Sequence, residues 1–208
     1  MRDTRYERGF TLAELLVALM VTSIVLTAVA TLAYALGAAN DATDDTSRKQ
    51  AQLRYTTLRI SDLIRHCRLI CGMPGNDLAI WRADDNNDGK INPTELVYLE
   101  AGQEKDRLGL LEFSWTGSWE LTISETQDIN TKTALILACT ERRTVLMPEC
   151  SDVQFHLDDV PPQSRRVGIS FNLTENEIER NYQINAALRG WAGNLLNAAA
   201  DSIITDDD

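Results

Sequence analysis

An apolar run near the N-terminus constrains the fold more than any other feature of the sequence. No residue from Leu15 to Ala39 is charged, and these 25 positions exceed the roughly 20 that a helix needs to cross a bilayer. Arg2, Arg5 and Arg8 precede the run. Arginines in this position hold their end of a membrane helix in the cytoplasm. We therefore predict a single-pass membrane protein with a cytoplasmic N-terminus and a C-terminal domain on the far side of the membrane.

A secretory signal peptide is the alternative interpretation of this run. The apolar region of a signal peptide usually has about 7 to 15 residues and ends at a small-residue cleavage site. The run in this chain is longer, and Gly9 and Glu14 follow its positive end. The stretch ALGAAN at residues 35–40 is similar to a cleavage site, so a secreted protein that starts near Asn40 stays open as an alternative.

The remainder of the chain is acidic and long enough for one globular domain. The 208 residues carry a formal net charge of −11 at pH 7. Such a surface repels the phosphates of nucleic acids, so we expect no nucleic-acid partner. A length of this order suits one membrane segment and one domain.

Residues 40–72 predict an amphipathic helix that follows the membrane segment. Its polar start, NDATDDTS at residues 40–47, is a point where the helix can loosen or break. Gly72 and Pro74 are a usual stop signal at the other end. The residues that recur at spacings of three and four, and so form one apolar face, are Leu53, Thr57, Ile60, Ile64, Cys67 and Cys71.

Residues 73–195 predict a β-rich domain that covers this apolar face. Short runs rich in β-branched and aromatic residues alternate with Gly, Pro, Asn or Asp, which is typical of strands and turns. The runs read DLAIWRA, ELVYLE, LLEFSW, WELTIS, TALILAC, RTVLMP, DVQFHLD, RRVGISFNL and RNYQINAALRGW. A strand-rich domain packed on a helix is an α+β architecture. Residues 196–208 end in three aspartates and are predicted to be a flexible acidic tail.

The N-terminal residues resemble those of the type IV pilin family, which includes the pseudopilins of type II secretion. The resemblance rests on Gly9, Phe10, Thr11, Leu12, Ala13 and Glu14, followed by the apolar run to Leu36. It implies a long N-terminal helix packed against an antiparallel β-rich domain. It also implies that residues 1–9 are a leader, that 10–39 are the transmembrane and assembly helix, and that a prepilin peptidase cuts between Gly9 and Phe10 and methylates the new N-terminus.

Glu14 is the one side chain between Phe10 and Leu36 that is charged at neutral pH. A lone acid in hydrocarbon is costly and tends to have a partner. The family resemblance implies that this carboxylate neutralises the new amine of Phe10 on a neighbouring subunit, since both charges are expensive to bury alone. A glutamate that simply lies among the lipid headgroups is the alternative.

The resemblance implies a structural subunit whose partners are other pilin or pseudopilin subunits. It also implies that the helix lies in the inner membrane, with the N-terminus in the cytoplasm and the C-terminal domain in the periplasm. A helix followed by many strands is most similar to the J-type minor pseudopilin of a type II secretion system, and the missing proline between Phe10 and Pro74 argues against a major pilin. Alternatives are a minor type IV pilus subunit for adhesion, motility or DNA uptake, and a membrane-anchored calcium-binding module that does not polymerise. No enzyme motif for a nucleophilic serine, a phosphate or a protease zinc occurs in the sequence, so we expect no enzymatic activity.

DDNNDGKINPTE, residues 84–95, matches the twelve-position calcium loop of EF-hands. Gly89 occupies the sixth position, where the chain turns sharply, and Ile91 occupies the apolar eighth position. The predicted Ca²⁺ ligands are Asp84, Asn86, Asp88, the Lys90 carbonyl, Asn92 and Glu95. The flanking runs read as strands, so we expect a calcium-braced connection between strands and a structural role for the ion. A turn rich in Asp and Asn that binds no metal is the alternative.

Four cysteines lie beyond the predicted membrane segment, where disulfides persist. They are Cys67, Cys71, Cys139 and Cys150, and four cysteines allow three pairings. Cys139 with Cys150 closes a short loop, and Cys67 with Cys71 are one helical turn apart. Buried free thiols and a zinc site that uses His66 are the alternatives.

Overall fold

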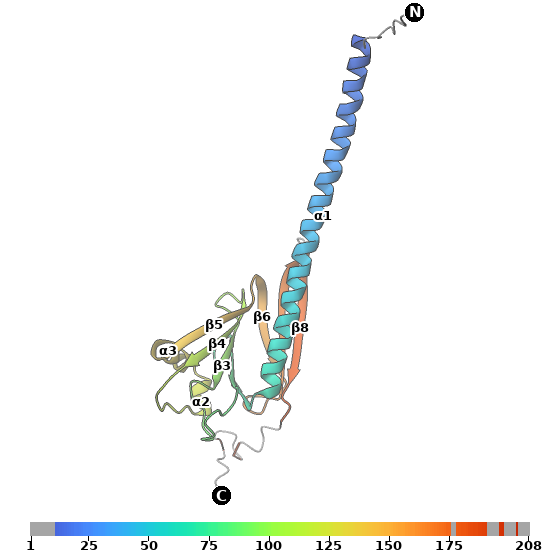
Figure 1. The fold of residues 1–208 in the computed structure, drawn as a ribbon. Coiled ribbons are helices and arrows are strands. Elements are labelled where there is room, and N and C mark those ends of the chain that lie inside the picture. Colours follow the sequence, from blue (N-terminus) through green and yellow to red (C-terminus); the bar gives the residue numbers. More distant parts are fainter. Residues whose placement is uncertain (1–10, 176–177, 191–195, 198–202, 204–208) are drawn as a thin grey trace, which may run out of the picture. The chain divides into compact units, whose positions relative to one another are not determined.

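The computed structural model describes residues 11–175, 178–190, 196–197 and 203 (Figure 1). The chain divides into two compact units, residues 1–47 and residues 48–208. One helix, α1 (Leu12–His66), is continuous across this boundary. The observed arrangement is a long N-terminal apolar helix followed by antiparallel β-sheets, so the predicted α+β, pilin-like fold is confirmed.

Residues 12–39 of α1, within the first unit, are exposed, and Glu14 is the one charged side chain among them. Among the described helices, α1 alone has the length and composition to cross a membrane. The threonine side chains of residues 12–39 form hydrogen bonds within the helix. The hydroxyl groups of Thr22, Thr27 and Thr31 each donate to the carbonyl oxygen four residues earlier. This pattern leaves no threonine hydroxyl of this segment without an acceptor in hydrocarbon.

The two helices predicted at 10–39 and 40–72 are one helix that ends at His66. The polar stretch 40–47 does not break it, because neither Gly nor Pro occurs between Gly37 and Gly72. The Thr43 hydroxyl donates to the carbonyl of Ala39 within the helix. The predicted C-terminal boundary is wrong by six residues, since β1 (Leu69–Gly72) follows the helix and pairs with the next strand.

The strands form two antiparallel sheets. The first has the order β1-β2-β3-β4-β5 and the second the order β6-β7-β8. Their bounds are β2 (Leu78–Trp81), β3 (Leu96–Glu100), β4 (Leu108–Ser114), β5 (Thr140–Met147), β6 (Cys150–Leu157), β7 (Arg166–Glu175) and β8 (Ile178–Ala187).

The five-stranded sheet is covered on both faces. One face joins a large cluster that also contains Ile60 and Ile64 of α1 and the inward side chains of β6, β7 and β8. The other face joins a second cluster, which includes Trp81 and Tyr98 and is closed by Leu135. Consequently β1 and β2 are buried along their whole length, which explains why their sequences are continuously apolar instead of alternating.

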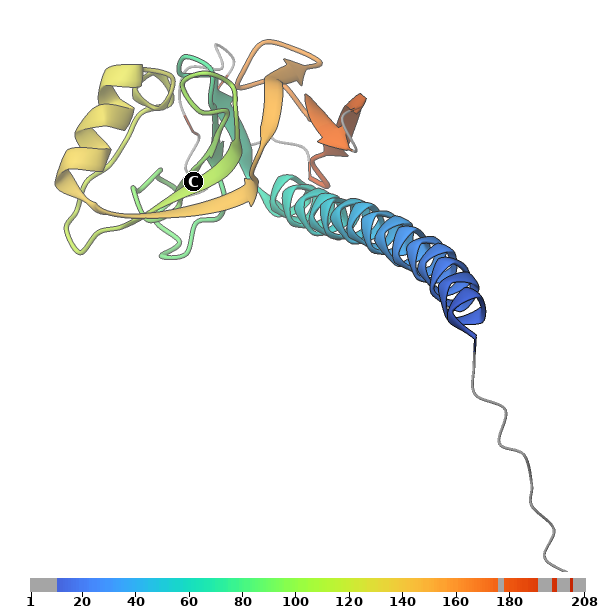
Figure 2. The ribbon, with the colours of Figure 1, turned by 90° about the horizontal axis from the view of Figure 1, so that it is seen from above.

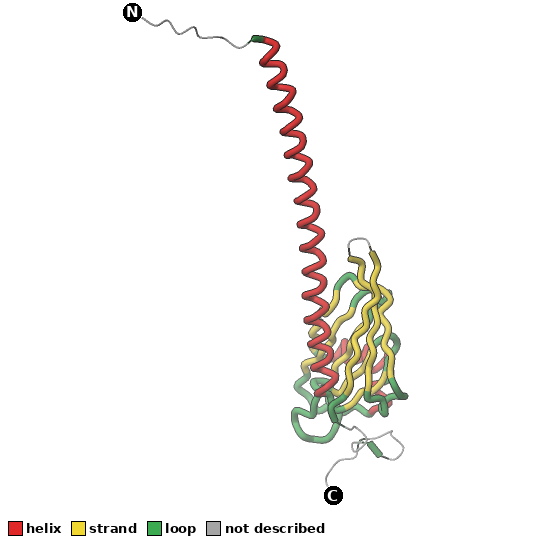
Figure 3. The backbone as a smooth tube through the Cα atoms, turned by 90° about the vertical axis from the view of Figure 1, so that its right-hand side faces the viewer, coloured by secondary structure: helices red, strands yellow, loops and turns green. Residues whose placement is uncertain are grey.

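The part of α1 within residues 48–208 is tied to the sheets by hydrogen bonds as well as by packing. The Lys49 ammonium donates to the carbonyl of Thr174 on β7 at 2.8 Å, and the Thr56 hydroxyl donates to the carbonyl of Leu146 on β5 at 2.6 Å. At the other end of this segment, the Arg189 N–H donates to the carbonyl of Arg65 at 3.1 Å. Figure 3 shows this part of the helix running alongside the strands.

Two predicted strands are wrong. WELTIS ends inside α2 (Ile123–Thr126), and TALILAC contains most of α3 (Ile129–Ala138), the yellow helix of Figure 2. The residues before each helix provide its N-cap. Thr122 and Glu125 form a capping box, and Asp128 accepts from the N–H of Asn130 at 2.9 Å. These caps outweigh the strand propensity of the apolar runs.

A buried ion cluster anchors α3 to the first sheet. The Lys132 side chain is 7% exposed, and its ammonium donates to Asp77 and to Glu100, each at 2.6 Å. It also lies 5.4 Å from the centre of the Tyr98 ring. The two carboxylates and the face of the aromatic ring offset the free-energy cost of burying the Lys132 ammonium.

The predicted tail, residues 196–208, is described only at 196–197 and 203. Leu196 is buried in the second cluster and forms an isolated bridge with Ile203. At these two positions the chain therefore packs against the domain, contrary to the prediction of a flexible tail.

Ile64 tests the contribution of the helix to the core. It is fully buried, whereas Leu58 on the same helix is 71% exposed. Replacing Ile64 by Ala should lower the free energy of unfolding by about 2–5 kcal/mol, because the truncation leaves a cavity. Leu58→Ala should change it by less than about 0.5 kcal/mol. Urea unfolding of the full chain in detergent, followed by tryptophan fluorescence, measures both, and equal effects would contradict the packing described here.

Candidate functional site

Glu14 lies in the first turn of α1 and forms a capping box with Thr11. Its Oε2 accepts the Thr11 N–H at 2.9 Å and the Thr11 hydroxyl at 2.9 Å. In return, the Glu14 N–H donates to the Thr11 hydroxyl oxygen at 3.3 Å. Such a reciprocal pair satisfies backbone donors that the first turn of a helix leaves free. The carboxylate is therefore held at the end of the apolar helix.

Sequence reasoning gave Glu14 a role but missed Thr11. The signal was present, because Thr, two further residues and Glu before an apolar run is the pattern of a capping box. Gly9 and Phe10 lie outside the described residues. Both members of the capping box follow the predicted cut, so the cap is part of the processed chain as well.

The aspartate loop, residues 84–95, connects β2 to β3, and the prediction of flanking strands is confirmed. Gly89 has a positive φ of 70°, which a glycine adopts without a steric penalty. The end of the loop forms one helical turn, since the Leu96 N–H donates to the carbonyl of Asn92 at 3.1 Å. Ile91 is fully buried in the second cluster, and its carbonyl accepts from Leu121.

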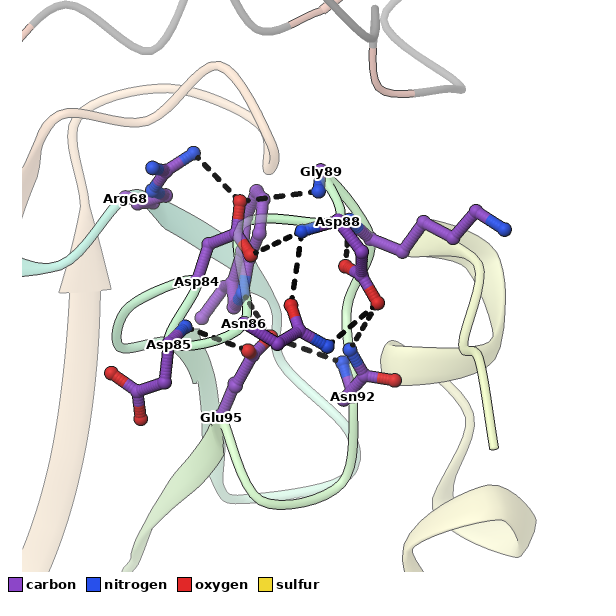
Figure 4. Close-up of polar contacts among 10 residues, drawn as sticks. Arg68, Asp84, Asp85, Asn86, Asp88, Gly89, Asn92 and Glu95 are labelled. Carbon is purple, nitrogen blue, oxygen red and sulfur yellow. Dashed lines mark hydrogen bonds and ion pairs between the residues drawn. The ribbon is translucent and has the colours of Figure 1, made fainter. Parts of the chain in front are cut away.

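Side chains at the predicted ligand positions point into the loop (Figure 4). Asp84 accepts the N–H groups of Asp88 at 3.1 Å and Gly89 at 3.2 Å. It also forms an ion pair with Arg68 at 3.3 Å. By contrast, Asp85 turns its carboxylate outward in Figure 4 and pairs with Arg82 at 3.0 Å.

Glu95, which closes the loop, connects it to the hydrophobic core. The residue is 1% exposed. Its Oε1 accepts the Asp85 N–H at 2.8 Å, and its Oε2 accepts the indole N–H of the fully buried Trp81 at 3.2 Å. A change in the position of this carboxylate would therefore change the hydrogen bonding of Trp81 in the core.

Asp88 is surrounded by donors. Asn86 and Asn92 direct their amide N–H groups at its Oδ2, at 2.7 and 3.0 Å, and the Lys90 N–H donates to its Oδ1 at 2.8 Å. Burial alone would raise the pKa of Asp88, but these hydrogen bonds and the Lys90 charge lower it. The carboxylate is thus ionised at neutral pH.

The donor set suits a hard cation, although the carboxylates are not gathered around one point. Among the described residues, no three or more His, Cys, Asp or Glu side chains are clustered closely enough to hold a metal. Here the carboxylate oxygens accept N–H donors of the loop itself. Rotation of the Asn86 and Asn92 amides would direct two neutral oxygens to the same interior. A recess of about 520 Å³ borders the loop at Asp88, Asn92 and Glu95 and gives solvent access.

A comparison with models of known protein families found one match, which lies at the N-terminus of the chain. Residues 4–30 match the family model for the prokaryotic N-terminal methylation motif. The chain carries a prepilin-type N-terminus. This motif is the signature of type IV pilins and pseudopilins, a structural family. Comparison with curated proteins and with solved structures gave no match.

The prepilin-type N-terminus includes the predicted cut and the capping box. Gly9, Phe10, Thr11 and Glu14 all fall within the matched residues 4–30. Together with the apolar helix α1, it fits an inner-membrane anchor. The aspartate loop at 84–95 lies outside the motif, so its role rests on its own residues.

The four cysteines are buried free thiols within the described residues. Cys139 and Cys150 stand at opposite ends of β5, and eight extended residues of about 3.4 Å each keep their Cα atoms much farther apart than a disulfide spans. The structure therefore does not bring this predicted pair together. Burial raises the pKa of Cys67 and of Cys71 to about 12, so both thiols stay protonated at neutral pH in the chain as described. Among the described residues, neither cysteine belongs to a group of three or more His, Cys, Asp or Glu that could hold zinc with His66.

Proposed function

We propose that this chain is a minor pilin-like structural subunit, a pseudopilin of a type II secretion system. It waits in the inner membrane and then assembles into a short periplasmic filament that drives protein export. The observation that carries this proposal is a prepilin-type N-terminus whose single acid, Glu14, is held at the start of an apolar helix. The work of such a subunit is mechanical and needs no catalytic group.

The assembly step follows from the chemistry of the N-terminus. Prepilin peptidase cuts between Gly9 and Phe10, and the new amine lies about one helical turn before Glu14. In the isolated chain Thr11 supplies donors to the Glu14 carboxylate. In a filament, the amine of a neighbouring Phe10 pairs with this carboxylate, so that neither charge is buried alone.

Two further features support the placement of the subunit. Arg2, Arg5 and Arg8 favour a cytoplasmic N-terminus, which puts residues 48–208 in the periplasm. The helix followed by two antiparallel sheets supports a J-type minor pseudopilin as the specific assignment. A minor type IV pilus subunit is the second candidate, favoured by the same N-terminus, and neighbouring genes for a retraction ATPase would indicate it.

We also propose that the aspartate loop binds Ca²⁺ as a structural ion. Asp84, Asn86, Asp88, Asn92, Glu95 and the Lys90 carbonyl are the proposed ligands. The Lys90 ammonium pairs with Glu120 at 2.8 Å, which keeps the positive charge away from the loop interior. The bound ion would offset two of the three negative charges of Asp84, Asp88 and Glu95 and would hold β2 and β3 in register.

Processing is the direct test of the proposed function. Mass spectrometry of the full chain recovered from the membrane of cells with a prepilin peptidase should find a methylated Phe10 as the first residue. Cells that lack the peptidase are the control and should retain Met1. An intact leader in peptidase-positive cells would overturn the proposal, and a first residue near Asn40 would indicate an ordinary secreted protein.

The role of Glu14 in assembly can be separated from its role as a cap. Glu14→Ala removes both the carboxylate and the cap, whereas Thr11→Ala removes the cap and keeps the carboxylate. We expect Glu14→Ala to reduce incorporation into sheared filaments by at least about tenfold, because the Phe10 amine then has no partner. Thr11→Ala should stay within about threefold of wild type, because a lost cap costs about 1 kcal/mol. Normal incorporation of processed Glu14→Ala would support a plain membrane anchor.

Calcium binding should be visible as stability. With a dissociation constant on the order of 10⁻⁴ to 10⁻³ M, adding 10 mM Ca²⁺ should raise the free energy of unfolding by about 1.4–2.7 kcal/mol. Trp81 fluorescence should change at the same time, because its indole N–H bonds to Glu95.

Matched variants identify the ligands. Glu95→Gln and the more exposed Asp88→Asn should both lose the calcium-dependent stabilisation, whereas Asp85→Asn, whose side chain points outward, should keep it. If the wild-type chain is equally stable in Ca²⁺ and in a chelator, the loop is a metal-free turn.

A further inference from the structure

Two recesses of the second unit meet at an exposed tryptophan. The recess of about 520 Å³ beside the aspartate loop has a neighbour of about 610 Å³, which is lined by the end of β4 and the start of β5. The residues that line both recesses are Asp85, Thr94, Trp115 and Thr116. We call the two recesses together the Trp115 groove. Each volume lies in the range of about 300–1,000 Å³ that is usual for small-molecule sites.

The indole of Trp115 is held in place, although the residue is 36% exposed. Its ring meets the ring of Trp119 edge to face, with 6.1 Å between the centroids, and Trp119 packs against the second core cluster. The indole also lies against Gly117, where a Cβ atom would come within 2.7 Å of the indole nitrogen. A side chain at position 117 would therefore displace the ring. The groove thus has an aromatic surface that is in position before any ligand binds.

The loop that carries Trp115 is tied to the aspartate loop. It starts directly after Ser114, the last residue of β4. Near its other end the Glu120 carboxylate pairs with the Lys90 ammonium at 2.8 Å, and the Leu121 N–H donates to the carbonyl of Ile91 at 2.8 Å. Because the loop is held at both ends, a ligand would need to order little of it, which lowers the entropic cost of binding.

The charged groups of the larger recess are already paired with one another. Arg82 pairs with Asp85 at 3.0 Å and with Glu112 at 3.5 Å. The Arg142 Nε also donates to Glu112, at 3.0 Å. The two arginines and two carboxylates that line this recess balance in charge. A guanidinium group has several N–H donors, so each arginine keeps donors for a ligand.

The charges of the groove favour a neutral ligand. Asp88, Glu95 and Glu120 also line the smaller recess, where a phosphate or carboxylate would face groups of like charge. The arginines of the larger recess oppose a cationic ligand in the same way. A neutral ligand that spans both recesses meets neither penalty.

We propose that the Trp115 groove binds a neutral oligosaccharide, with the face of one sugar ring on the indole of Trp115. The C–H groups of a sugar ring carry partial positive charge and suit the negative face of an aromatic ring. The sugar hydroxyls donate to the carboxylates of the groove and accept from its arginines, and such charge-assisted hydrogen bonds are the stronger ones. This site goes beyond the structural role proposed above and depends neither on assembly nor on a bound ion.

An extended peptide fits the groove less well. Extended peptides are commonly recognised through a free strand edge, with pockets for alternate side chains. Strand β4 offers no free edge, because β3 and β5 pair with it on its two sides. Of the four residues shared by the two recesses, only Trp115 is apolar.

Calorimetric titration of the full chain with oligosaccharides tests the proposal. The detergent is lauryldimethylamine oxide, because alkyl glycosides would compete for the groove. The probes are cellotetraose, whose polar groups are hydroxyls and ether oxygens, and tri-N-acetylchitotriose, which adds acetamido groups. Saturable binding of either supports the proposal, and the preferred probe identifies the sugar class. Trigalacturonate should bind at least about tenfold more weakly than the preferred probe, because its carboxylates face Asp88 and Glu120.

Variants locate the binding in the groove. Trp115→Ala should weaken binding of the preferred probe by at least about tenfold, since the aromatic surface is lost, and Trp115→Phe should weaken it less. Gly117→Ala should also weaken it, because the added Cβ atom moves the indole. Arg142→Gln removes charged donors at a side chain that is 71% exposed, and it should weaken binding without a risk to the fold. Tyr55→Ala is the matched control, because this exposed aromatic residue of α1 lies outside the groove, and it should bind as wild type does.

Four results would overturn the proposal. They are a wild-type chain that binds neither neutral probe, a folded Trp115→Ala variant with wild-type affinity, an equal loss of affinity in Tyr55→Ala, and equal affinity for trigalacturonate. Binding of an uncharged peptide such as hexaglycine in place of both sugars falls under the first and would indicate a peptide site. If Trp115→Ala does not fold, wild-type affinity of Arg142→Gln together with Gly117→Ala overturns the proposal instead.

Discussion

The cost of placing charge in hydrocarbon governs the N-terminal part of this protein. An apolar helix that crosses a bilayer must satisfy each polar group that it keeps. The threonines of α1 do so by bonding to helix carbonyls, and Glu14 does so by accepting both donors of Thr11. The carboxylate is thus stable in the lone subunit, yet its partner is a neutral hydroxyl and an amide. In the filament that we propose, a cationic amine on a neighbouring chain would form a stronger, charge-assisted hydrogen bond with this carboxylate, so assembly would exchange a weaker partner for a better one.

The second unit is built around a sheet that is buried on both faces. Its central strands have no polar face to offer solvent, so the candidate metal site stands in a loop at one end of the sheet. The aspartate loop joins β2 to β3, and Glu95 links it to Trp81 in the core. An ion bound at the loop would therefore act on the packing of the sheet and not on a separate lobe.

Much of the fold follows from the sequence, and the exceptions have identifiable causes. Strands β2, β3 and β4 were predicted because Gly, Asn and Asp bound their apolar runs, and the aspartate loop between β2 and β3 followed from its ligand spacing. The segment Leu69–Gly72 was assigned to the helix because Cys67 and Cys71 fit a helical period, yet pairing with β2 decides its structure. TALILAC has strand composition, but the Asp128 cap and the Lys132 cluster make it helical. The capping role of Thr11 was not predicted, because the family resemblance assigns a role to Glu14 and none to Thr11.

The bonds that tie α1 to the sheets have a mechanical consequence. Lys49 holds the segment at one end through the Thr174 carbonyl, Thr56 holds it midway through Leu146, and Arg65 holds the other end through Arg189. These attachments are spread along the helix, so a pull directed along its axis stretches them together in shear and does not unzip them one after another. A subunit of this design can pass tension from its anchor to its globular body without first peeling the helix away.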